Sequence, residues 1–164
     1  IMIVYHGTTL IIQHPDTNHS KDFLDFGKGF YLTTFAEQAE KWAYRKGMRQ
    51  HKIPIVNVYD LGDIHTFRVN RFERMNTDWL SFVCECRMGS DKYKPYDAVI
   101  GHVADDDVFK CINMYIEGAW DEARTLKELE YYKDNDQIVL ISQEIINSTL
   151  VFIKSYEVST NGTR

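Results

Sequence analysis

The sequence predicts a single domain of the α+β class. Segments with strand character lie toward both ends of the chain, helical patterns gather in the middle, and the two kinds do not alternate regularly. Regular alternation would instead favour a doubly wound parallel sheet. The 164 residues, of which 44% are hydrophobic and 26% charged, suffice for one substantial core. We therefore expect one domain over residues 1–158 and a frayed C-terminal tail over residues 159–164.

The first third of the chain reads as strand, strand and helix. Residues 1–8, IMIVYHGT, form an apolar run typical of a buried strand, and residues 30–34, FYLTT, form a shorter one. Thr33 or Thr34 is expected to cap a helix over residues 35–49, because a glutamate follows Thr34 by three positions as in a capping box. The spacing predicts one buried stripe on this helix, made of Phe35, Ala39, Trp42 and Ala43.

The rest of the chain predicts further strands and helices. Residues 53–61 and 64–69 are expected to pair as strands around a Gly-Asp turn at Gly62. Residues 77–87 have apolar side chains at helical spacing, so a second helix is expected there. The elements that follow are a strand over 96–103, a helical region over 106–132 that breaks near Gly118, a strand over 136–142, a short helical turn, and a strand over 149–159.

Charge and cysteine content exclude several classes of protein. A net charge of −5 argues against a broad phosphate-binding face, and the expected source of a local basic patch is Arg45, Lys46, Arg49 and Lys52. The three cysteines, Cys84, Cys86 and Cys111, contain no CxxC pair and fit reduced thiols better than a disulfide framework or a zinc site. No apolar run approaches the roughly 18 residues of a membrane span, and no signal peptide is recognised. We therefore expect a cytoplasmic protein without a membrane partner.

Polar residues at two strand ends are candidates for chemistry. His6-Gly7-Thr8 closes the first strand, where it exposes an imidazole and a backbone that a ligand can approach closely. Asp136 and Gln137 open the apolar strand IVL near the C-terminus. In a strand these two point to opposite faces, so only one of them can face a given cleft. Solvated or structural side chains at strand ends are the ordinary alternative.

A glycine-rich segment before the second strand is the next candidate. Gly27 and Gly29 allow a bend and a close backbone approach, and Tyr31 presents a flat face suited to stacking on a planar heterocycle. Trp42, eleven residues further along, is expected to close such a pocket from the other side. The structural alternative is a loop followed by two core aromatic residues.

Together the segments YHGTTL, DFGKGFYLTTFAEQAEKWA and NDQIVLIS resemble the ADP-ribosyltransferase superfamily, on its diphtheria-toxin and poly(ADP-ribose) polymerase side. Those proteins carry His-Gly-Ser/Thr on an early strand, a Gly-Lys-Gly-Ile-Tyr-like segment before a helix, and a polar residue, usually Glu, on a late strand. With YDAVIGHVADD between them, the segments are most similar to the bacterial branch called domain of unknown function 3990. The resemblance spans most of the chain. It implies split central antiparallel β-sheets with flanking helices.

The resemblance also implies NAD as co-substrate, cleaved between nicotinamide and ribose, with ADP-ribose passed to an acceptor. By this resemblance His6 would bond the adenosine ribose, the Gly7 backbone would clamp the nicotinamide carboxamide, and Tyr31 would stack on the nicotinamide ring. The residues implied to assist are Thr8 near the adenosine ribose, Trp42 opposite Tyr31, and Gly27 and Gly29, which would keep the loop close to the cofactor.

The late strand departs from the family pattern. Polymer-forming relatives have Glu there, whereas an ungapped comparison places Asp136 at that point and the bacterial branch favours Gln137. We favour Gln137 as the ribose contact, with Asp136 as the alternative. An amide can bind a hydroxyl but cannot act as a general base near neutral pH, so polymer formation is not expected. The expected catalytic set is therefore His6, Tyr31 and Gln137.

The implied function is a mono-ADP-ribosyltransferase acting on a protein or nucleic-acid acceptor. Its size and fold are typical of bacterial toxin–antitoxin or anti-phage toxins, so a small antitoxin protein is an expected partner. Two alternatives stay open: a non-catalytic module that binds NAD or ADP-ribose, and an NAD glycohydrolase with water as acceptor. No metal is expected, because the run at residues 105–107 is interpreted as a helix cap. With Asp97 and Gly101, that run would alternatively form a wall on the acceptor side.

Overall fold

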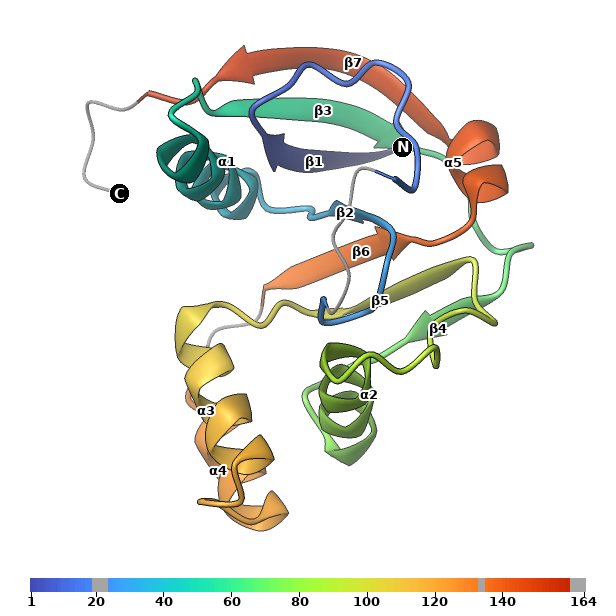
Figure 1. Cartoon of the computed structure of the whole chain (residues 1–164). Helices are drawn as coiled ribbons and strands as arrows, with labels where there is room; N and C mark the ends of the chain where they lie inside the picture. The colour runs from blue at the N-terminus through green and yellow to red at the C-terminus, as the bar shows by residue number, and fades with distance from the viewer. Residues whose placement is uncertain (19–23, 133–134, 160–164) are drawn as a thin grey trace.

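The computed structural model describes residues 1–18, 24–132 and 135–159, and within them the chain forms two β-sheets flanked by five helices (Figure 1). This is the mixed α+β architecture that the sequence predicts. Of the tail predicted over residues 159–164, only Ser159 belongs to the described residues.

The first sheet is antiparallel and consists of β1 (Met2–Thr8), β3 (Ile55–Leu61) and β7 (Leu150–Glu157), in the order β1-β3-β7. Side chains alternate between its faces, as a pleated strand requires. Val56 and Val58 pack against the first helix, whereas Tyr59 and Leu61 enter the core between the sheets.

The second sheet has the order β2-β6-β5-β4. Its strands are β2 (Phe30–Leu32), β6 (Asp136–Leu140), β5 (Ala98–His102) and β4 (Val69–Arg71); β4 and β5 are parallel and the other pairs antiparallel. Both faces of this sheet are covered. Ile138 and Leu140 join the core between the sheets, and Val99 and Val139 join a second core on the opposite face.

One backbone junction connects the two sheets. Tyr5 of β1 and Thr33, just after β2, form an antiparallel bridge with N–H···O distances of 2.8 and 3.0 Å in the two directions. Because β1 and β2 are both edge strands, this bridge brings two residues that are 28 positions apart in sequence side by side.

The helices are α1 (Ala36–Gln50), α2 (Thr77–Arg87), α3 (Asp106–Ile116), α4 (Glu122–Leu129) and α5 (Gln143–Thr149). The second helix matches its predicted bounds, and the predicted break near Gly118 separates α3 from α4. Figure 1 shows α1 beside the first sheet and α2, α3 and α4 below the second. Asp105 caps α3 by accepting a hydrogen bond from the Val108 N–H, as the run of aspartates predicts.

The predicted hairpin around Gly62 is wrong. Instead of turning back, the chain after β3 crosses to the other sheet, where β4 pairs with β5. The Gly62 N–H donates to the carbonyl of Thr149, and the Asp97 carboxylate accepts from the Arg68 N–H. The segment does contain a short turn, in which the Phe67 N–H donates to the carbonyl of Ile64 at 3.0 Å, but this turn does not return the chain to β3.

The predicted cap of α1 is also wrong. The N-cap position is Phe35, which makes no side-chain cap hydrogen bond within the described part of the chain. The hydroxyls of Thr33 and Thr34 donate to the carboxylate of Asp136 instead, at 3.1 and 2.7 Å. Phe35 is 47% exposed rather than buried, because the stripe that packs on the first sheet consists of Gln38, Ala39, Ala43 and Gly47.

Gly7 sets the distance between β1 and α1. A Cβ atom at this position would lie 1.9 Å from the carbonyl oxygen of Ala39 and 2.8 Å from the nitrogen of Ala43. Both are helix backbone atoms that cannot rotate away. Glycine at position 7 is therefore a packing requirement of the fold, in addition to any contact with a ligand.

We predict that Gly7→Ala lowers the free energy of unfolding by about 2–3 kcal/mol, because the new methyl group separates α1 from β1. Gly62→Ala is the matched control, since a Cβ there meets Thr149 only at ordinary contact distance. Urea denaturation of both variants measures the difference. Equal stability of the two variants would contradict the packing argument.

Candidate functional site

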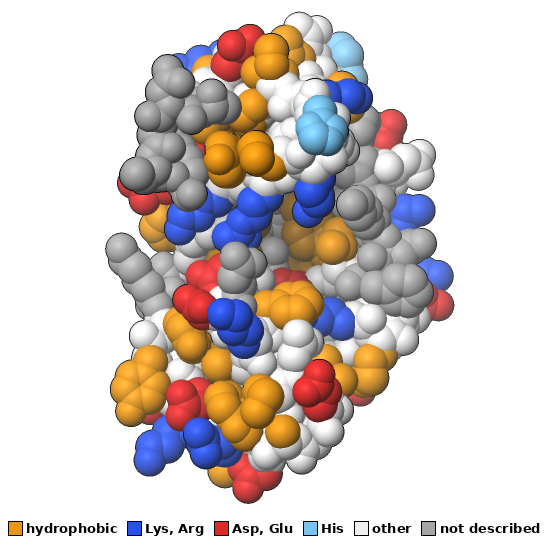
Figure 2. Space-filling view, turned by 60° about the vertical axis from the view of Figure 1, so that its left-hand side comes forward, with side chains coloured by type: hydrophobic (Ala, Val, Ile, Leu, Met, Phe, Trp, Pro, Cys, Tyr) orange, Lys and Arg blue, Asp and Glu red, His pale blue; other side chains and the backbone are white. Residues whose placement is uncertain are grey.

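A cleft of about 400 Å³ lies between α1, the strands β1, β2 and β6, and the segments around α2 and α3; we call it the central cleft. Figure 2 shows a hollow across the middle of one face of the molecule, with Lys and Arg side chains along its upper side. The residues that line the central cleft are His6, Gly7, Leu24, Asp25, Tyr31, Trp42, Arg45, Lys46, Arg49, Arg87, Val103, Ala104, Phe109 and Gln137.

His6 enters the cleft from β1, next to the junction of the two sheets. Its Nδ1 lies 2.7 Å from the carbonyl oxygen of Tyr31. A carbonyl only accepts, so Nδ1 carries the proton and Nε2 is the acceptor of the neutral ring. The imidazole also stacks on Phe30, with ring centroids 4.1 Å apart. The orientation of the ring is thus fixed by β2 on two sides.

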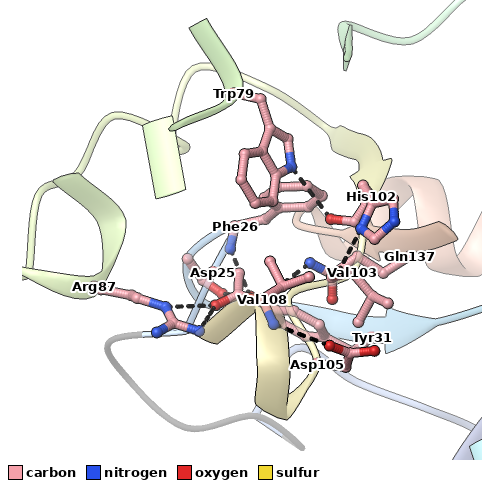
Figure 3. Close-up of polar contacts among 11 residues, drawn as sticks. Asp25, Phe26, Tyr31, Trp79, Arg87, His102, Val103, Asp105, Val108 and Gln137 are labelled. Atoms are coloured by element: carbon pink, nitrogen blue, oxygen red, sulfur yellow. Dashed lines mark hydrogen bonds and ion pairs between the residues drawn. The ribbon is translucent and has the colours of Figure 1, made fainter. Parts of the chain in front are cut away.

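Tyr31 is held through its hydroxyl group. The hydroxyl donates to the carbonyl of Gly27 at 2.6 Å and accepts from the N–H of Phe26 at 3.0 Å (Figure 3). Burial raises the pKa of Tyr31 well above its usual range, and the nearby Asp25 carboxylate raises it further. The phenol therefore stays protonated and serves as an anchor that keeps the aromatic ring against the cleft.

Gln137 is the second residue of β6 and is 2% exposed. Asp136, its neighbour, points to the other face, where Thr33 and Thr34 bind its carboxylate. The alternation of the strand thus puts the amide in the central cleft and the carboxylate in the junction between the sheets. Of the two residues that the sequence left open, Gln137 is the one that lines the cleft.

Asp25 and Arg87 form a buried ion pair in the cleft that the sequence analysis missed. The Arg87 Nε and Nη2 atoms lie 2.6 and 2.5 Å from the same oxygen, Oδ1 of Asp25, and the side chains are only 11% and 12% exposed. The guanidinium lies over the ring of Phe109, 3.7 Å from its centroid. The pair joins a loop to the end of a helix 62 positions away, so periodicity could not reveal it. The one available signal was a charged residue two positions before Gly27.

Four predicted cofactor-binding residues lie outside the cleft lining: Thr8, Gly27, Gly29 and Asp136. Thr8 is buried and accepts a weak hydrogen bond from Lys46 Nζ at 3.4 Å. Gly27 has φ +83°, and a Cβ there would meet the ring of Tyr93 at 2.0 Å. A Cβ on Gly29 would lie 2.6 Å from Val139. These glycines shape the loop that carries Asp25 and Phe26 rather than the cleft wall.

One face of α1 supplies a basic and aromatic wall. Trp42, Arg45, Lys46 and Arg49 are spaced by three, one and three residues, which places them on neighbouring turns of the same helix face. Three of the four residues expected to form a local basic patch therefore lie at the cleft. The fourth, Lys52, lies at a larger cavity of about 720 Å³ between the end of α1 and the end of β7. That cavity contains none of the predicted site residues, whereas the three predicted catalytic residues all line the smaller central cleft.

The described residues contain no group of three or more His, Cys, Asp or Glu side chains placed to hold a metal ion. Cys84, Cys86 and Cys111 are free and buried. Burial raises the pKa of the Cys84 thiol to about 11 and that of Cys86 to about 12, so neither is a reactive thiolate near neutral pH. None of the helices in the described ranges combines the length and apolar character needed to cross a membrane.

The sequence matches the family described as Protein of unknown function (DUF3990) over residues 2–152. The match covers most of the chain, so the protein belongs to this family. No curated protein and no solved structure matches the chain. The family description names no function.

We predict that Tyr31→Phe lowers the free energy of unfolding by about 1–3 kcal/mol, because the Gly27 carbonyl and the Phe26 N–H lose their buried partner. Tyr131→Phe is the control, since Tyr131 is 77% exposed and its change should stay within about 0.5 kcal/mol. Thermal and urea unfolding measure both. An unchanged stability of Tyr31→Phe would show that the hydroxyl is not an anchor.

Proposed function

We propose that this protein is an NAD-dependent mono-ADP-ribosyltransferase. The observation that carries the proposal is that His6, Tyr31 and Gln137, from three strands far apart in sequence, line one cleft. Their order along the chain is that of the superfamily that the sequence resembles. The backbone of Gly7 and the cationic side chains of the cleft also support a bound dinucleotide.

The backbone of Gly7 is oriented for a carboxamide. The N–H and C=O of Tyr5 point away from β3, since they pair with Thr33, and alternate residues of an antiparallel strand point the same way. The N–H and C=O of Gly7 therefore also point away from β3, on the side of the cleft. A nicotinamide carboxamide would bond both groups, while its ring lies between Tyr31 and Trp42.

The charged residues suit the pyrophosphate of NAD. Arg45, Lys46 and Arg49 form a cationic row beside Trp42. Arg87 adds a buried donor, because its Nη1 has no hydrogen-bond partner among the described residues. Phosphate oxygens are acceptors that match both kinds of group.

The reaction breaks the bond between ribose C1′ and the nicotinamide nitrogen. The bonding electrons pass to the pyridinium, which leaves as neutral nicotinamide, and positive charge develops on the ribose. The acceptor then bonds C1′ and loses one proton. In this scheme the cleft orients the ring and the ribose, and Gln137 binds a ribose hydroxyl. Gln137 cannot take up the proton, so the acceptor must be nucleophilic without a base from β6.

The proposal predicts that the protein releases nicotinamide from NAD and that His6→Ala lowers kcat/KM by about 100-fold or more, through loss of orientation. His65→Ala is the matched control, because the His65 side chain is 75% exposed and lies outside the cleft. Chromatography of the released nicotinamide gives the rate, and melting temperatures verify that both variants are folded. Absence of release by the wild-type protein under all conditions would favour the NAD-binding module.

The acceptor is identified with NAD that carries biotin on the adenine ring. Label that partitions with protein or with nucleic acid after incubation in a cell lysate supports transfer and names the acceptor class. Free ADP-ribose as the sole product would instead assign the protein as an NAD glycohydrolase.

A further inference from the structure

Asp25 is the one carboxylate among the described residues that line the central cleft. Its two oxygens have different partners. Oδ1 accepts both contacts from Arg87, and Oδ2 lies 3.5 Å from the Nε2 of Gln137 (Figure 3). Asp25 therefore connects the cation at the end of α2 with the amide near the start of β6.

Arg87 leaves Asp25 little freedom. The guanidinium is always charged and planar, and its Nε and Nη2 atoms approach Oδ1 in a fixed fork. Phe109 packs on the face of the guanidinium, which restrains its plane. Since both contacts fall on Oδ1, the second carboxylate oxygen is directed to Gln137.

This arrangement decides which end of the Gln137 amide faces a ligand. A carboxylate can only accept hydrogen bonds, so the amide must present its NH₂ group to Asp25. The carbonyl oxygen of Gln137 is then the end left to accept a hydrogen bond in the cleft. An amide without such a partner could turn over and present a donor instead.

We propose that Asp25, fixed by Arg87, is a positioning residue that holds the Gln137 amide with its carbonyl oxygen toward the bound ribose. The cleft consequently selects ligands with a hydroxyl donor at this point. The identification of that hydroxyl as one of the NAD ribose hydroxyls rests on the proposed function, whereas the orientation of the amide does not.

The first experiment needs no substrate. In ¹⁵N-resolved NMR spectra of the free protein, the side-chain NH₂ signals of Gln137 are identified by their absence in Gln137→Glu. We expect the side-chain amide protons of Gln137 to exchange slowly with solvent in the wild-type protein. In Asp25→Asn their chemical shifts should change, and they should exchange at least about tenfold faster. Gln143, which lies outside the cleft and donates to the Pro15 carbonyl, is the internal control. Unchanged Gln137 signals in Asp25→Asn would overturn the proposal, whether or not the protein turns over NAD.

The second experiment places a carboxylate at position 137, with and without the carboxylate of Asp25. Gln137→Glu keeps the Asp25–Arg87 pair but places the new carboxylate at position 137 close to that of Asp25. Two carboxylates this close share a proton, so the pH profile of nicotinamide release should show an additional ionisation. In Asp25→Asn/Gln137→Glu the amide introduced at position 25 can donate to the new carboxylate at position 137, which then accepts from the ribose. We expect kcat about tenfold below the wild type in each single variant, with little change in KM, and a higher kcat in the double variant than in either single one.

The two experiments separate the hypotheses. The positioning role of Asp25 would be wrong if the double variant lost kcat by the product of the two single losses and the pH profile of Gln137→Glu were unaltered. That result would leave the transferase proposal intact. A wild-type protein that binds NAD without releasing nicotinamide, but whose Gln137 signals depend on Asp25, would overturn the transferase proposal alone. Melting temperatures are measured for every variant, because Asp25→Asn leaves the buried Arg87 without its ion-pair partner.

Discussion

The candidate site depends on one junction, the pair of backbone hydrogen bonds between Tyr5 and Thr33. Each belongs to the edge of a different sheet, and edge strands have backbone groups that need partners. Joining the edges places His6 beside Tyr31, and a third bond, from the imidazole to the Tyr31 carbonyl, follows from that placement. If the two sheets separated at this junction, the imidazole of His6 would move away from Tyr31. The geometry of the cleft therefore depends on the stability of the junction.

The strand β6 supports this junction with one residue and lines the cleft with the next. Asp136 binds the hydroxyls of Thr33 and Thr34 and the N–H of Thr34, at the point where the chain leaves β2 for α1. Gln137 points to the opposite face. The three hydrogen bonds hold the Asp136 carboxylate in the junction, and the alternation of the strand therefore leaves the amide of Gln137 in the cleft. The Thr33 hydroxyl also accepts from the N–H of Phe35 at 3.1 Å, so its acceptor contact falls on the N-cap residue and not on an N–H inside α1.

The sequence was informative where structure is determined locally and uninformative where distant segments decide. The helix Thr77–Arg87 and the break between α3 and α4 follow from apolar spacing and a glycine, so both were predicted. The strand β4 was assigned the wrong partner, because Asp97 and β5, about 30 positions away, determine where residues 68–71 lie. The same rule holds for the site. Motifs identified His6, Tyr31 and Gln137 one by one, but the Asp25–Arg87 pair exists only after a loop and a helix end have met.

The balance of charge inside the cleft constrains its ligand more strongly than any single residue does. The whole chain carries a net charge of −5, yet the described cleft lining has four cationic side chains and one carboxylate. Asp25 is bound to Arg87, and the other three cationic side chains of the lining lie in the row on α1. A concave site of one sign within an acidic protein concentrates anionic ligands and repels cationic ones. A nicotinamide riboside without phosphate would satisfy the aromatic and amide contacts but not this field. An anionic ligand with a planar aromatic group would satisfy both, and the NAD of our proposal, with its pyrophosphate, is one such ligand.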